Sequence, residues 1–358
     1  MKNRVSPLAT GFMIIGALCG ASFASGQEIL KFFCSYGKTA FIAFPMCFIL
    51  YVALGRMTFF IGRKRNTDKI EDIVAPSDNI VIKKICQGIM FFCFFAIMTA
   101  LMAAGDAVTV ETLGFPGGVG GLIITVLVIV TNIVGIKGIQ KVIPKVVPIM
   151  AAMILVTSVL VPAVTKKVEF ADPAVYSSPL APVWIMGALL YLAYNFLAAI
   201  PVISTLPREK EEVSTSKKGL VLGFGGICVM GILITFAISS DVGNAGLCEL
   251  PMVFLAGKVS PLLAAAYSIV LVIAIYCSSS NCLFGLTKGL KGDRKIRRAL
   301  IISIIAAISY VISLAGFSTL VTYVSPLQGY ACIFILILLI FSFIKERFDV
   351  NNQDDLEI

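Results

Sequence analysis

The sequence predicts an all-helical polytopic membrane protein of about ten transmembrane helices, arranged as a five-plus-five inverted repeat with its first and sixth helices discontinuous. Three observations support this fold class. Of the 358 residues, 58% are hydrophobic and 14% are charged, whereas a soluble domain carries about 25% charged residues. Ten apolar stretches are each long enough to cross a bilayer, which takes about 20 residues. Polar residues interrupt the first and the sixth of these stretches.

The first stretch, residues 7–33, carries the clearest interruption. Its centre reads Gly20-Ala21-Ser22-Phe23-Ala24-Ser25-Gly26-Gln27-Glu28. Glycine weakens a helix, serine competes for backbone hydrogen bonds, and an amide and a carboxylate at bilayer depth each need a partner. The run is either a helix broken at the membrane centre or a small-residue face packed on a neighbouring helix. Because packing alone does not account for Gln27 and Glu28, we favour the broken helix.

The other nine stretches alternate with polar or basic loops. The sixth is interrupted by Tyr194-Asn195 and by Pro201, and the eighth carries the serine run Ser278-Ser279-Ser280. The predicted spans are residues 38–62, 82–106, 118–136, 142–164, 181–203, 218–240, 260–286, 297–315 and 321–344.

Lysine and arginine set the expected orientation, because they are retained in cytoplasmic loops. With ten spans and the N-terminus inside, only five of the 29 basic residues fall on the outer side, namely Lys31, Lys38, Lys166, Lys167 and Lys258. Shifting the count by one span destroys this separation. Both termini are therefore predicted to be cytoplasmic.

Ten spans divide into two halves of five, and an odd number per half turns the second half upside down relative to the first. We predict one membrane domain, residues 1–358, with repeat one at about 6–164, repeat two at about 181–344 and a short cytoplasmic tail at 345–358. The first segment of each half carries an interruption. Corresponding interruptions point to the binding site of a transporter.

Composition excludes several other classes of function. The chain has no histidine and no CxxC pair among its ten cysteines, which removes zinc-protease, catalytic-triad and haem-attachment motifs. The cysteines are expected to act as small packing residues. The net charge of +9 is interpreted as a topology signal rather than as a nucleic-acid footprint. We expect no enzyme activity, no cofactor other than a coupling ion, and no nucleic-acid partner.

The run Gly20-Ala21-Ser22-Phe23-Ala24-Ser25-Gly26-Gln27-Glu28, followed by Phe32-Phe33, resembles the FASGQE signature of the YkvI-like bacterial membrane proteins. That group is similar to the amino acid–polyamine–organocation (APC) superfamily, and the resemblance covers the whole chain. It implies the LeuT-type fold, secondary transport and a multi-pass location in the bacterial cell (inner) membrane. It supplies no substrate.

On that fold the first and sixth helices open at the midplane and hold a solute between them. The predicted substrate site consists of Gly20, Ala21, Ser22, Ser25, Gly26, Gln27 and Glu28 with Tyr191, Tyr194 and Asn195. Glu28 would ligate a cation, pair with a substrate amine, carry a proton or cap opened backbone. A purely structural carboxylate, and tyrosines that only pack, are the alternatives.

A sodium site is predicted at Ser278 and Ser279, on the inner half of the eighth helix. LeuT-type sodium carriers donate hydroxyl oxygens from this position to an ion shared with first-helix carbonyls, here near Cys19 and Ser22. At most two of three consecutive serines face one direction. The alternative is that the serines bond carbonyls of their own helix.

Asp106, at the outer end of the third span, is expected to be simply exposed at the interface, where charge is inexpensive. Its role is left open.

The function predicted from these features is that of an ion-coupled secondary transporter, with sodium favoured over protons. Its solute would be a small amino-acid-like molecule or organocation, moved by alternating access. The alternative is a receptor on the same fold that binds solute without moving it, like the permease-related subunits of spore germinant receptors. The expected partners are the solute and the lipid bilayer; the oligomeric state, direction and stoichiometry stay open.

Overall fold

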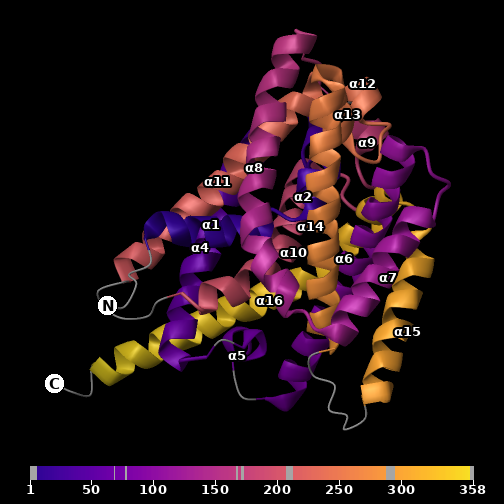
Figure 1. Ribbon diagram of the computed structural model, residues 1–358. Helices are drawn as coiled ribbons and strands as arrows, with labels where there is room; N and C mark the ends of the chain where they lie inside the picture. The colour runs from indigo at the N-terminus through magenta and orange to yellow at the C-terminus, as the bar shows by residue number, and fades with distance from the viewer. Residues whose placement is uncertain are drawn as a thin grey trace.

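The computed structural model describes residues 6–67, 69–76, 79–166, 168–170, 173–206, 213–287 and 295–354. Every regular element in these ranges is helical (Figure 1). In chain order the elements are α1 Pro7–Leu18, α2 Ala21–Ala24, α3 Gln27–Phe32, the 3₁₀ turn η1 Cys34–Thr39, α4 Ala40–Arg65, α5 Ile70–Val74, α6 Ile80–Leu113, α7 Val119–Val134, α8 Lys137–Thr165, α9 Pro173–Tyr176, α10 Trp184–Ser204, α11 Val213–Ser239, α12 Val242–Ala245, α13 Pro251–Val259, α14 Pro261–Thr287, α15 Lys295–Ser313 and α16 Phe317–Asp354.

All ten predicted spans are present as helices. Eight of the described segments are long and apolar enough to cross a membrane, and α1 and α7 are shorter apolar helices. In order, the spans are the α1–α3 segment, α4, α6, α7, α8, α10, α11, α14, α15 and α16. The last helix continues past residue 344 to Asp354, so the predicted tail begins as helix. The basic residues Lys2, Arg4, Lys167, Arg208, Lys210, Lys288, Lys291 and Arg294, which entered the orientation argument, lie outside the described residues.

Large apolar side chains remain exposed all around the helices. Val134 on α7 is 83% exposed, Val159 on α8 60% and Val311 on α15 65%. A soluble protein rarely leaves such extended apolar surface in water. The exposed belt is the surface that a bilayer covers.

The helices of the two halves pack in matching pairs, as an inverted repeat requires. Helix α1 packs on α11 as α10 packs on α4, and α6 packs on α16 as α14 packs on α8. Helix α7 contacts α14 as α15 contacts α6. The pairs α6–α14, α4–α11 and α7–α15 join corresponding helices of the two halves. The packing therefore follows the predicted five-plus-five arrangement.

The two ends of the bundle differ in charge. We call one the basic face; it carries the end of α4, the short helix α5, the starts of α6 and α11 and the end of α16. There Lys64 and Arg65 pair with Glu346 at 2.9 and 2.8 Å, and Lys83 pairs with Asp72 at 2.7 Å. The opposite face carries α9, α12 and α13, at the top of Figure 1.

Asp106 has a structural role, so the expectation of simple exposure is wrong. Its carboxylate accepts hydrogen bonds from the Gly118 amide at 2.8 and 2.9 Å and from the Gly121 amide at 3.2 Å. These amides belong to the start of α7, whose first N–H groups have no partner within the helix. Gly118 has φ +93°, a conformation that glycine adopts readily. Asp106 on α6 therefore caps α7.

Candidate functional site

The first span is broken, as predicted. Helix α1 ends at Leu18, Gly20 is extended with φ −73° and ψ 172°, and α2 lasts only from Ala21 to Ala24. Gly26 then turns the chain with φ +83° before α3 begins at Gln27. The Ser25 hydroxyl donates to the Ser22 carbonyl at 2.7 Å and accepts from the Gln27 amide at 3.2 Å, which holds this turn in place. We refer to residues 19–26 as the break.

The break leaves backbone groups without partners. The carbonyls of Gly16, Ala17 and Cys19 accept no described hydrogen bond, because the amides that would continue α1 turn away from it. A side chain added at Gly20 would meet open space. A hollow of about 630 Å³ between α1, α8 and the end of α10 reaches Gly16 and Ala17. Backbone carbonyls at membrane depth need a partner from outside the helix when the helix ends there.

The sixth span is not broken, so the predicted opening at Tyr194-Asn195 is wrong. Helix α10 winds without interruption from Trp184 to Ser204. The Asn195 amide donates to the Tyr191 carbonyl one turn earlier, at 3.2 Å, so this polar side chain is satisfied within the helix. Pro201 lies in the last turn of α10, where the loss of one hydrogen bond does not open the helix at its centre.

Helix α10 nevertheless brings its two tyrosines to α3. The ring of Tyr191 meets that of Phe33 edge-on at 4.9 Å and that of Phe32 at 5.7 Å. The Tyr194 ring lies 5.8 Å from Phe32 and 5.6 Å from Tyr191. These four rings form one wall at the C-terminal end of α3.

Glu28 lies against this wall. Only 8% of it is exposed, and it interacts electrostatically with Tyr194, Tyr191 and Tyr51 of α4. No cationic side chain of the described residues forms an ion pair with it. We call Glu28, Tyr51, Tyr191 and Tyr194, with Phe32 and Phe33, the central cluster.

Several buried polar atoms at the cluster have no hydrogen-bond partner. They are the hydroxyls of Tyr51 and Tyr194 and both amide atoms of Gln27. The Tyr194 hydroxyl lies near the Glu28 carboxylate without reaching hydrogen-bond geometry. An unsatisfied buried polar group costs about 1–3 kcal/mol. Such groups are completed by an ordered water, an ion or a ligand.

The side of the break away from the basic face is covered. The Met252 amide, at the start of α13, donates to the Ser25 carbonyl at 3.0 Å. The Tyr267 hydroxyl of α14 donates to the Ala24 carbonyl at 2.6 Å. Helices α13 and α14 therefore cover the break from this side.

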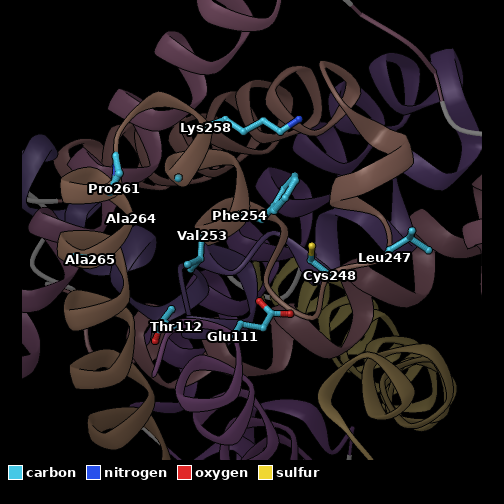
Figure 2. Close-up of a pocket in the computed structure, with 11 residues that line it drawn as sticks. Glu111, Thr112, Leu247, Cys248, Val253, Phe254, Lys258, Pro261, Ala264 and Ala265 are labelled. Atoms are coloured by element: carbon cyan, nitrogen blue, oxygen red, sulfur yellow. The ribbon is translucent and has the colours of Figure 1, made fainter. Parts of the chain in front are cut away.

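A second hollow, of about 690 Å³, lies beyond this cover (Figure 2). It is enclosed by the end of α6, the loop before α13, α13 itself and the start of α14. Its charged groups are engaged: Glu111 accepts from the Glu249 amide at 2.7 Å, and Lys258 pairs with Asp241 and lies 5.2 Å from the Phe254 ring. Burial, with a smaller contribution from Glu111, raises the pKa of the Cys248 thiol to about 11, so the thiol is neutral at pH 7. The hollow lies on the outer side of α13, next to Met252, which covers the break.

The predicted serine ligands are not joined to the break by any described hydrogen bond. Tyr267 is the residue of α14 that bonds the break. Ser278 follows eleven residues later, about 16 Å further along the helix axis. Ser279 is fully buried and its hydroxyl has no partner. Nearby, the Asn132 amide of α7 donates to the Ser280 carbonyl at 3.3 Å. The predicted sodium site at Ser278 and Ser279 therefore stays a prediction.

Sequence reasoning missed Tyr51, Tyr267 and Met252. The two tyrosines lie inside apolar stretches, where a hydroxyl needs a partner as much as a carboxylate does, and that was a usable signal. Met252 is an ordinary apolar residue whose backbone makes the contact, so nothing in its type could have indicated it.

In fold, the chain is similar to solved transporters of the LeuT type. One is Mhp1, a nucleobase-cation-symport-1 family transporter, in a closed conformation with bromovinylhydantoin bound: the TM-score is 0.54 at 14% identity, covering 90% of this chain and 77% of that one. Another is a mutant manganese transporter of Eremococcus coleocola, with a TM-score of 0.53 at 15% identity, covering 95% of this chain and 78% of that one. The predicted fold class is confirmed except for the sixth helix, which is continuous. These neighbours are transporters rather than enzymes.

In sequence, the chain is similar to two proteins of Bacillus subtilis (strain 168). The membrane protein YkvI is 24% identical over 331 residues, 92% of this chain and 93% of that protein. The protein YyaD is 23% identical over 338 residues, 92% of this chain and 94% of that protein. No protein-family model matches the chain. The predicted resemblance to YkvI-like membrane proteins is confirmed over nearly the whole length.

Proposed function

We propose that this protein is an ion-coupled secondary transporter of a small solute that carries an amino or ammonium group, an amino-acid-like molecule or an organocation. The solute binds at the central cluster and moves by alternating access in the bacterial cell membrane, with both termini cytoplasmic. The observation that carries the proposal is Glu28, a buried carboxylate that has no cationic partner among the described residues.

The chemistry of the cluster favours a cationic group. A carboxylate in a membrane interior needs a counter-charge or a proton, and an ammonium supplies the charge. The ring centroids of Tyr191, Tyr194 and Phe32 lie 5.6 to 5.8 Å from one another. Aromatic rings attract an ammonium group through cation–π interactions. Gln27 and the free hydroxyls of Tyr51 and Tyr194 add hydrogen bonds for the polar parts of the solute.

The coupling ion is proposed to be sodium, bound at the carbonyl end of α1. The unpaired carbonyls of Gly16, Ala17 and Cys19 are hard oxygen ligands, and the C-terminal end of a helix dipole favours a cation. A contribution from Ser278 and Ser279 stays a prediction. Protons are the alternative coupling ion, with Glu28 as their carrier.

A thermal-shift screen tests the binding site. Purified protein is heated with amino acids, betaines or amines, each in sodium or in potassium chloride. A ligand at 100 times its dissociation constant stabilises the native state by about 2.7 kcal/mol, so a cationic solute is expected to raise the melting temperature, and more so in sodium. If only neutral or anionic compounds raise the melting temperature, the cationic assignment fails. Equal shifts in the sodium and potassium salts would exclude sodium as the coupling ion.

Uptake into proteoliposomes separates transporter from receptor. A sodium gradient is expected to drive accumulation of the solute found in the screen above its outside concentration. Binding without accumulation, under any ion gradient, would establish the receptor instead.

A further inference from the structure

A third hollow lies at the basic face, and none of its lining residues belongs to the central cluster. It opens between the second half of α4, the start of α11 and the end of α16, on the left and lower left of Figure 1. Its volume is about 410 Å³, and a neighbouring hollow of about 390 Å³ shares Arg56 and Lys217 with it. The larger one is lined by Ala53, Arg56, Met57, Phe59, Phe60, Arg63, Val213, Lys217, Phe343 and Arg347.

The charges on this lining are all positive. Arg56, Arg63, Lys217 and Arg347 are exposed, and no carboxylate lines either hollow. Among the described residues, no aspartate or glutamate forms an ion pair with any of the four. The next residues along α4 behave differently, because Lys64 and Arg65 are both paired with Glu346. The lining thus gathers four cations whose mutual repulsion a bound anion would relieve.

The floor beneath these cations is apolar. Phe59 is 4% exposed, and the rings of Phe60 on α4 and Phe343 on α16 meet edge-on at 5.4 Å. Met57 and Ala53 continue this floor along α4. Arg56 precedes Arg63 by two helical turns, about 10 Å along the axis. The cations therefore border an apolar groove instead of forming a flat polar patch.

This combination has one natural occupant at a membrane surface. A free phosphate needs the charges but gains nothing from the phenylalanines, and a detergent-like apolar chain gains nothing from the arginines. A phospholipid with an anionic headgroup uses both, and basic pockets between the ends of transmembrane helices are where such headgroups bind. The positive-inside rule also assigns this face to the cytoplasmic leaflet, whose anionic lipids would be in reach.

We propose that this hollow is a binding site for an anionic glycerophospholipid. The phosphodiester pairs with Arg56, Arg63, Lys217 and Arg347, and the acyl chains lie along Met57, Phe60 and Phe343. The lipid joins α4, α11 and α16 at their basic ends and stabilises that contact. The site does not depend on the transported solute or on the coupling ion.

Native mass spectrometry of the purified protein tests the site with phosphatidylglycerol as probe and phosphatidylcholine as the matched zwitterionic lipid. The pocket variant is Arg56→Gln/Arg347→Gln. The control variant, Lys84→Gln/Arg297→Gln, removes the same charge from exposed positions on α6 and α15. We expect one phosphatidylglycerol to stay bound to the natural protein and to the control, and its occupancy to fall about tenfold in the pocket variant.

Three results would overturn the proposal. Equal occupancy in the pocket and control variants would mean that the lipid responds only to overall charge. Equal binding of phosphatidylcholine would remove the anionic headgroup from the account. Competition by inorganic phosphate or glycerol phosphate at concentrations similar to that of the lipid would identify a free-anion site. A melting-temperature rise with phosphatidylglycerol, present in the control and lost in the pocket variant, is the second expected readout.

Discussion

The first and sixth spans occupy equivalent places in the two halves, but they accommodate their polar residues differently. Both carry polar side chains at bilayer depth. In the first span the backbone opens at Gly20 and again at Gly26, and the side-chain amide of Gln27 has no hydrogen-bond partner. In the sixth, Asn195 bonds the Tyr191 carbonyl of its own helix and α10 stays intact.

This difference shows that a polar residue in a membrane helix does not by itself break the helix. What breaks the first span is the combination of Gly26 in a left-handed conformation with backbone partners supplied from outside, the Met252 amide and the Tyr267 hydroxyl. No described external partner of this kind meets the backbone of α10 around Asn195. The opened backbone is therefore confined to one half, and α10 contributes side chains only.

The largest effect on transport is expected from Glu28→Gln, which removes the buried carboxylate charge from the broken first span. Breaking a buried charge pair costs about 3–5 kcal/mol, so we expect uptake in proteoliposomes to fall at least about a hundredfold. Glu169→Gln, at an exposed position, is the matched control and should transport normally. Unchanged uptake in the Glu28 variant would remove Glu28 from the mechanism.

The next effect concerns the turn itself. Gly26→Ala places a side chain at φ +83°, with its Cβ 2.8 Å from Cγ of Met252. Left-handed backbone costs about 1–2 kcal/mol for an L-residue, and the contact adds to this, so the free energy of unfolding should fall by about 2–3 kcal/mol. Gly20→Ala, at φ −73° with open space around it, should change stability by less than about 0.5 kcal/mol. Melting curves of both variants check the contrast, and equal losses would contradict it.

The same contrast explains what the sequence could and could not predict. The ten spans, the break and the buried Glu28 follow from hydropathy and from glycine, serine and charge inside an apolar stretch. The continuity of α10 could not be predicted, because an asparagine that breaks a helix and one that bonds its own backbone look alike in sequence. The cover by Met252 depends on a backbone amide that every residue type except proline has. The capping by Asp106 needed the position of α7, twelve residues further on.

A smaller effect on the free energy of unfolding is expected from removing the hydroxyls of two tyrosines, and its sign should differ between them. The contrast tests whether the central cluster binds a ligand. The Tyr194 hydroxyl has no partner, whereas the Tyr267 hydroxyl bonds the Ala24 carbonyl at the break. Tyr194→Phe should therefore raise the free energy of unfolding of the ligand-free protein by about 1 kcal/mol while weakening solute binding about tenfold. Tyr267→Phe should lower stability by about 1–3 kcal/mol. Loss of stability in both variants would show that the Tyr194 hydroxyl is bonded within the protein.

The smallest effect is expected in the sixth span, at Asn195→Ala. Its amide donates only within α10, and alanine is the best helix former, so stability should change by less than about 1 kcal/mol and uptake by less than about twofold. Asn132→Ala is the comparison, because the Asn132 amide also reaches the Ser280 carbonyl of α14 and its loss removes an interhelical hydrogen bond. A strong loss of transport in Asn195→Ala, with stability intact, would mean that α10 opens at this residue during the cycle. The two halves would then differ in their resting state only, and the sixth span would regain the role its sequence suggests.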